Sequence, residues 1–141
     1  MGAEFNGPKE FREVMDRIFT LMSEDPDMGP KLRDADVPQR FEFEDMDMVV
    51  NIRAAEEDED GNLHWEWTDD VGWKSKVQMK MNSDIANKYF QGKENVAVAI
   101  ARRRIKTGGD VKAALSLIPI TKPVYAQYRE VVEDEYPHLK V

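Results

Sequence analysis

Hydrophobic residues recur along this chain at two different spacings. The first stripe has the three- and four-residue spacing of a helix and consists of Phe11, Val14, Met15, Ile18 and Met22. Asn6 is a good capping residue and Pro8 suits the first helical turn, so we expect this helix to begin at Pro8. The prolines and glycine of residues 23–30 end it, and residues 31–35 predict a short second helix.

From residue 37 the spacing changes to two, which is typical of strands with one buried face. Strands are predicted at residues 37–44, 48–54, 63–67 and 74–81. We expect Asp60 and Gly61 to supply the positive backbone dihedrals of a hairpin loop between the second and third strands. Four consecutive, closely spaced strands of this kind predict an antiparallel meander with one solvated face.

After residue 81 the helical spacing returns. Helices are predicted at residues 83–90, 96–101, 110–118 and 123–132, and residues 105–107 predict a short fifth strand. A helical block, a block of strands and a second helical block indicate an α+β fold with the helices gathered on one face of the sheet. The length of 141 residues favours a single domain over residues 1–141.

Composition narrows the classes of function. The chain has 28 acidic and 20 basic residues and a net charge of −8, so we expect no nucleic acid partner. It has no cysteine, which excludes disulfides, thiolate metal sites and cysteine nucleophiles, and a cytoplasmic location is the default expectation. No apolar run reaches the roughly 18 residues of a membrane span, so we expect no stable membrane insertion.

Patterns that would indicate catalysis or metal binding are weak. The acidic loop before the third strand has Trp67 where an EF-hand needs a bidentate Glu. His64 lies on the polar face of its strand and His138 in the C-terminal tail, and the sequence indicates no partner for either. An enzyme would need a buried carboxylate, or His64 in a cleft. We therefore expect no catalytic residue, no metal, no cofactor and no enzymatic activity.

Two features each have a structural and a functional interpretation. The arginines of residues 102–104 either stabilise the end of a helix or form a docking spot for anionic lipid headgroups or an acidic partner surface. Met46, Met48, Met79 and Met81 either fill the core or line a ligand pocket, because methionine adapts to varied apolar shapes.

Residues 76–118 contain the segment VQMKMNSDIANKYFQGKENVAVAIARRRIKTGGDVKAALSL. This segment resembles the motif-bearing half of the sterol carrier protein two domain, the non-specific lipid-transfer fold. The positions that match the family pattern are Asp84, Phe90, Gly92, Lys93, Asn95, Ala97, Ala101, Ile105, Lys106, Gly109, Asp110 and Leu115. One position departs from that pattern: the family usually has a glycine shortly before the short fifth strand, and this chain has Arg103 and Arg104 there.

The resemblance implies a twisted, mainly antiparallel sheet of five strands with helices over one face. It also implies an apolar tunnel between the two layers that binds and transfers sterols, fatty acids or fatty acyl-coenzyme A. The residues expected to contact the ligand are Val50, Ile52, Trp65, Trp67, Val77, Met79, Met81, Phe90, Ile100, Leu115, Ile118, Tyr125 and Tyr128. The last helix has an acidic end that the helix dipole disfavours, so we expect that end to fray and the helix to act as a lid.

Two functional hypotheses follow. In the first, the partner is an apolar small-molecule lipid, and a lipid-metabolising enzyme is a second candidate partner. In the other, the protein is an accessory subunit of an enzyme that keeps the fold but fills the tunnel with its own Met and Trp side chains. A lipid that can be extracted from the purified protein distinguishes the first hypothesis from the second.

Overall fold

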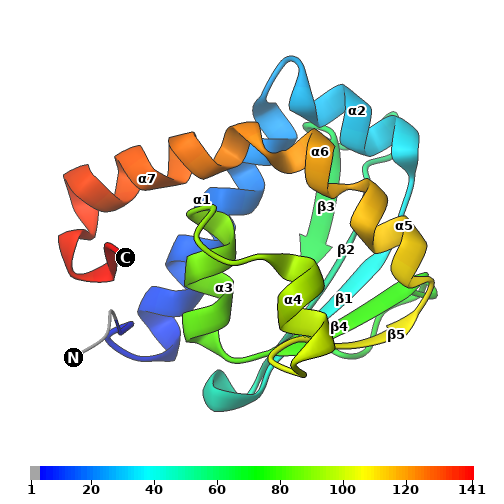
Figure 1. Ribbon diagram of the computed structural model, residues 1–141. Coiled ribbons are helices and arrows are strands. Elements are labelled where there is room, and N and C mark those ends of the chain that lie inside the picture. The colour runs from blue at the N-terminus through cyan, green and yellow to red at the C-terminus, as the bar shows by residue number, and fades with distance from the viewer. Residues whose placement is uncertain (1–3) are drawn as a thin grey trace.

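The computed structural model describes residues 4–141, so the first three residues of the expected domain lie outside the described residues. The helices are α1 (Pro8–Glu24), α2 (Met28–Ala35), α3 (Ser83–Phe90), α4 (Val96–Ala101), α5 (Val111–Ser116), α6 (Ile118–Thr121) and α7 (Pro123–Glu135), with 3-10 turns η1 (Glu44–Met46) and η2 (Pro137–Leu139). The strands are β1 (Gln39–Phe43), β2 (Met48–Ala54), β3 (Leu63–Glu66), β4 (Val77–Met81) and β5 (Lys106–Gly109). The helices cover one face of the sheet (Figure 1). None of the helices in the described chain combines the length and apolarity of a membrane span.

The five strands form one sheet in the order β3-β2-β1-β4-β5. Three neighbouring pairs are antiparallel, but β4 lies parallel to β1, with Phe41 beside Met79. The predicted mainly antiparallel meander is therefore wrong, and the sheet is mixed. A parallel pair needs a crossover connection, whereas an antiparallel pair can be joined by a tight turn. Residues 67–76 make this crossover by running from the end of β3 to the free edge of β1.

Most of the predicted elements are confirmed, with small shifts in their bounds. α1 begins at Pro8 as predicted, but its N-cap residue is Gly7 and not Asn6. α2 begins at Met28, three residues earlier than expected. The helix predicted at 110–118 is α5, which Asp110 caps by accepting the backbone N–H of Ala113 at 3.0 Å, and a separate short helix, α6, follows it.

The inner face of the sheet is apolar. Phe41 pairs with Val50 on one side and with Met79 on the other, so the three side chains point to the same side of the sheet. The same register places Ile52, Val77 and Met81 on this face, and all of them are buried. These residues therefore form the face of the sheet that is turned toward the core.

The outer face of the sheet carries ion pairs. Arg40 contacts Glu42 at 3.3 Å and Asp69 at 2.8 Å, and Lys80 contacts Glu42 at 3.1 Å from the neighbouring strand. The hydrogen bond from Lys80, with Arg40 close by, lowers the pKa of Glu42. Because removing these charges from water would be costly, this face stays solvated and the helices pack on the opposite face.

Two tryptophans fix α1 to the edge of the sheet. The indole Nε1 groups of Trp65 and Trp67 both donate hydrogen bonds to Oδ1 of Asp16, at 3.0 and 2.7 Å. Phe19 packs against Trp65 with a ring-centroid separation of 5.6 Å in an edge-on geometry. The N-terminal helix therefore covers β3, as part of the helical layer that was expected on one face of the sheet.

The end of α7 makes contacts that oppose the expected fraying. Leu139 is completely buried, and its carbonyl accepts hydrogen bonds from Nδ2 of Asn87 at 2.9 Å and Nε2 of Gln91 at 2.8 Å. Arg17 in α1 donates to both carboxylate oxygens of Glu135 near the end of α7, at 3.3 and 2.9 Å. These contacts fasten both α7 and the chain that follows it.

The Asp16→Ala substitution tests the attachment of α1. It leaves two half-buried indole N–H groups without their shared acceptor, and hydrogen bonds to charged groups contribute roughly 1.5–3 kcal/mol each. We expect the free energy of unfolding, measured by urea denaturation, to fall by about 2–4 kcal/mol. Glu133→Ala is the control, because it removes only an exposed pair with Lys140 at 3.6 Å and should change stability little. Equal effects of the two substitutions would contradict the assignment.

Candidate functional site

A small apolar cavity lies between the sheet and the helices. Its volume is about 40 Å³. It is lined by Phe19, Met22, Leu32, Val37, Gln39, Phe41, Ile52, Ala54, Leu63, Tyr89, Phe90, Ala114, Leu117 and Thr121. These residues come from both layers, and none of them carries a charge. The cavity is therefore suited to uncharged, largely apolar groups.

The predicted ligand-contact residues divide into three groups in the structure. Ile52 and Phe90 line the cavity. Buried in the core around it are Val50, Val77, Met79, Met81 and Tyr128. Half-buried against the core are Trp65, Trp67, Ile100, Leu115, Ile118 and Tyr125. Contact between any of these residues and a ligand stays a prediction.

The N-terminal helices contribute lining residues that the sequence interpretation missed. Phe19 and Met22 come from α1, and Leu32 comes from α2. The apolar stripe of α1 is visible in the sequence, but its position over the sheet follows from the contact between Asp16 and the two tryptophans. No local spacing predicts a contact between residues so far apart in the chain.

Three polar side chains line the otherwise apolar cavity: Gln39, Tyr89 and Thr121. Burial raises the pKa of Tyr89, and the neighbouring Tyr125 adds to this effect, so the phenol stays neutral and keeps its O–H donor. An amide, a phenol and an alcohol can each donate and accept hydrogen bonds. Together they suit the polar end of an uncharged amphiphile.

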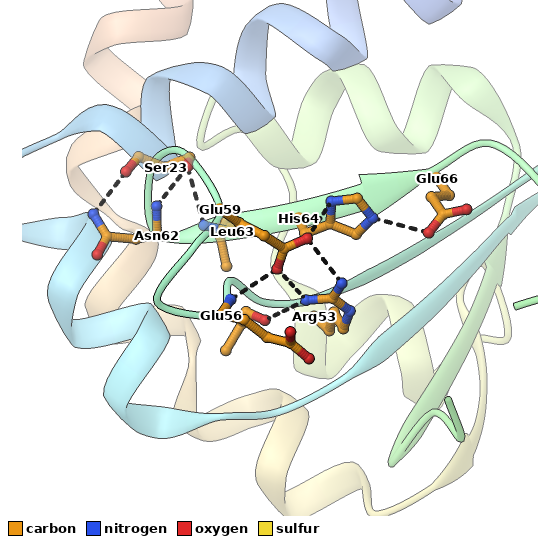
Figure 2. Close-up of polar contacts among 9 residues, drawn as sticks. Ser23, Arg53, Glu56, Glu59, Asn62, Leu63, His64 and Glu66 are labelled. Atoms are coloured by element: carbon orange, nitrogen blue, oxygen red, sulfur yellow. Dashed lines mark hydrogen bonds and ion pairs between the residues drawn. The ribbon is translucent and has the colours of Figure 1, made fainter. Parts of the chain in front are cut away.

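The β2–β3 hairpin is fastened to the end of α1 beside this cavity. Oγ of Ser23 accepts the backbone N–H groups of Asn62 and Leu63 at 2.9 and 3.0 Å, and Nδ2 of Asn62 donates to the carbonyl of Ser23 at 2.8 Å (Figure 2). Gly61 has a φ of 73°, as predicted, but Asp60 does not share its positive φ. A side chain at Gly61 would collide with Ser23. The hairpin therefore holds Met22 and Leu63 at the cavity wall.

A charged cluster on the outer face shapes the same hairpin loop. Arg53 donates two hydrogen bonds to Glu59, at 2.6 and 3.0 Å, and the backbone N–H of Glu56 donates to Glu59 at 2.8 Å (Figure 2). The hydrogen bonds from Arg53 are the main reason that the pKa of Glu59 falls to about 2. His64 lies between two carboxylates, 3.2 Å from Glu59 and 2.9 Å from Glu66.

The contacts of Glu59 with Arg53 and with the backbone of Glu56 form a clamp on the hairpin loop. Within residues 4–141, both ring nitrogens of His64 contact carboxylate oxygens, and no hydroxyl group hydrogen bonds to the ring. No group of three or more His, Cys, Asp or Glu side chains in the same range is arranged to hold a metal ion. The cluster therefore explains how the hairpin loop is held. It lies on the outer face of the sheet, and the cavity lies on the inner face.

Solved structures with the same fold are found, although no model of a known protein family and no curated protein matches the chain. Sterol carrier protein 2 from Yarrowia lipolytica superposes with a TM-score of 0.57 and 14% identity, over 89% of this chain and 98% of that protein. The ubiquinone synthesis protein UbiJ-SCP2 gives a TM-score of 0.60 and 8% identity, over 83% of this chain and 96% of that one.

The fold also occurs inside a larger enzyme. The stereoselective inverting sec-alkylsulfatase Pisa1 from Pseudomonas sp. matches with a TM-score of 0.61 and 20% identity over 75% of this chain. The matched region is 16% of the sulfatase chain, so this protein corresponds to a small part of that enzyme. At these identities the comparisons show a shared fold.

The Glu59 clamp makes a prediction about acid stability. Because the pKa of Glu59 is about 2 in the folded protein and near 4.5 without its partners, the clamp stabilises the fold above pH 4.5. That stability is lost as the pH falls from 4.5 toward 2. Urea denaturation over this range should therefore show a shallower loss of stability for Glu59→Gln than for the wild type. Glu57→Gln in the same loop should keep the wild-type slope, and identical slopes for all three proteins would contradict the prediction.

Proposed function

Since this chain has the fold of sterol carrier protein two domains, we propose that it binds and transfers an apolar lipid between its sheet and its helices. The observation that supports the proposal is the apolar, charge-free lining of the cavity, to which both layers contribute. Removing apolar lipid surface from water contributes about 25 cal/mol per Å², so such a lining binds lipid without needing specific polar contacts.

Ligand binding requires the cavity to enlarge. An engineered apolar cavity of about 150 Å³ in another protein holds one benzene molecule. The cavity here has a volume of about 40 Å³, which is too small for a sterol or an acyl chain. The proposal therefore treats this arrangement as the closed, ligand-free form, and it requires part of the helical layer to move outward.

The segment of α5 and α6, residues 111–121, is the part of the cover best suited to move. Its buried side chains are Ala114, Leu117 and Thr121, and all of them line the cavity. Short helices with few buried residues open more easily than long, well-anchored ones. Leu115 and Ile118 are half-buried in the same segment, and outward movement would let their apolar surface contact a ligand. This segment replaces α7 as the proposed lid.

The lining also suggests a ligand class. No cation lines the cavity to neutralise a buried carboxylate, whereas Gln39, Tyr89 and Thr121 can hydrogen bond to a neutral polar group. Of the sterols, fatty acids and acyl-coenzyme A esters that the resemblance implies, the proposal favours the neutral sterols, and a long-chain alcohol meets the same requirement.

Filling the cavity should block binding. Ala114→Leu places a larger side chain in the cavity wall, so we expect the affinity of delipidated protein for a fluorescent long-chain alcohol to fall at least tenfold in an equilibrium titration. Ala126→Leu makes the same change on the exposed side of α7 and should keep wild-type affinity. Overpacking costs about 1–3 kcal/mol, so circular dichroism must first show that the variants fold. Unchanged affinity in folded Ala114→Leu, or no saturable binding by the wild type, would contradict the proposal.

The charge-free lining predicts a pH effect on ligand preference. A long-chain carboxylic acid should displace the fluorescent alcohol well only below its own pKa, where it is neutral, and progressively less well at higher pH. An unlabelled alcohol of the same chain length should compete equally at every pH where the protein stays folded. Stronger competition by the ionised acid than by the alcohol would refute the neutral-ligand assignment.

A further inference from the structure

A surface apart from the cavity combines exposed apolar residues with cations. Val98 in α4 is 40% exposed and is one of two large hydrophobic residues exposed in the described chain, the other being Val141 near the C-terminus. Ala97 and Ala101 are also exposed, and their spacing puts them beside Val98 and Arg102 on one side of the helix. The outward side of α4 is therefore apolar and leads directly into cationic residues.

Arg103 has a backbone conformation that favours glycine. Its φ is 61°, in the left-handed region that L-residues with a side chain rarely adopt. The N–H of Arg103 donates to the carbonyl of Ile100 at 3.1 Å, and the N–H of Arg104 donates to Ala99 at 2.8 Å. These two bonds define a helix ending whose left-handed position is usually a glycine. Arginine therefore occupies this position at some cost in stability.

Arg103 and Arg104 border a hollow of about 290 Å³ that lies beside β4, α3 and β5. Its lining residues are Glu44, Lys80, Met81, Asn82, Asp84, Ile85, Arg103, Arg104 and Lys106. Arg104 is paired with Glu94, and Lys80 is paired with Glu42. In the described chain no ion pair forms with Arg102, Arg103 or Lys106. Glu44 and Asp84 also line the hollow, but residues 102–106 themselves carry four cations and no acidic residue in a chain whose net charge is −8.

We propose that α4 and residues 102–106 form a docking surface for an anionic lipid membrane. Arginine forks bind phosphate oxygens, so Arg102 and Arg103 would contact headgroup phosphates while Val98 and its neighbouring alanines enter the interfacial layer. Small apolar side chains bury little area, which makes the contact reversible and peripheral. The inference rests on the proposed function, because a lipid carrier has to reach the membranes between which it exchanges its ligand.

A membrane explains the combination of features better than an acidic protein partner does. Cations alone would suit an acidic protein, but exposed apolar residues beside cations are typical of segments that lie in the membrane interface. The attraction acts within about a Debye length of the surface, roughly 8–10 Å. The four cations of residues 102–106 outnumber the nearby carboxylates of Glu44, Asp84 and Glu94.

Two substitutions at Arg103 separate its charge from its backbone strain. Arg103→Gly removes the charge and relieves the positive φ, whereas Arg103→Gln removes the charge and keeps the strain. In sedimentation with vesicles of phosphatidylcholine and phosphatidylglycerol, both should bind about fivefold more weakly than the wild type, because one cation near an anionic leaflet contributes roughly that factor. Only Arg103→Gly should also raise the melting temperature.

The controls test the surface separately from the cavity. Lys122→Gln removes an exposed cation far from α4 along the chain and should keep wild-type vesicle binding, and Val98→Ser should weaken it. Wild-type protein should bind phosphatidylcholine vesicles poorly, and added salt should release it from the anionic ones. Both Arg103 variants should bind the fluorescent alcohol with wild-type affinity. Absence of alcohol binding would therefore contradict the proposed lipid site in the cavity and not the docking surface. Wild-type vesicle binding by both Arg103 variants, or no binding of the wild type to anionic vesicles, would overturn the proposal.

Discussion

The structure depends on a sheet that has one apolar face and one charged face. On the outside, Glu42 pairs with Arg40 along β1 and with Lys80 on the neighbouring β4, so a second layer of helices there would have to remove charges from water. The inner face, with Phe41 and Met79 side by side at its centre, must in turn be covered. Short helices packed on a twisted sheet leave the small cavity, and that cavity is the basis of the proposed lipid site.

Local features of the fold could be predicted from the sequence, and long-range features could not. β2, α3 and α4 have their expected bounds because alternation, capping residues and helix stops are properties of neighbouring residues. The strand order is a different kind of property. Nothing in the spacing of residues 67–76 says whether the chain turns back beside β3 or crosses to β1, and the crossover makes the sheet mixed.

The candidate site likewise combines local features that could be predicted from the sequence with long-range features that could not. The apolar character of the space between the layers follows from the strand pattern, and two of the residues predicted to contact a ligand, Ile52 and Phe90, line the cavity. Its position depends on α1, which Asp16 anchors through two indole groups at the edge of the sheet. Arg103 combines a local and a structural observation. Its departure from the family's glycine is visible in the sequence, but its positive φ is visible only in the structure.

The central claim is that the space between the sheet and the helices opens to hold one lipid molecule. Native mass spectrometry tests it most directly, applied to protein purified without delipidation and to delipidated protein incubated with a sterol or a long-chain alcohol. The account predicts a species whose mass equals one chain plus one neutral lipid, absent from the Ala114→Leu variant. Protein mass alone in both preparations would contradict it.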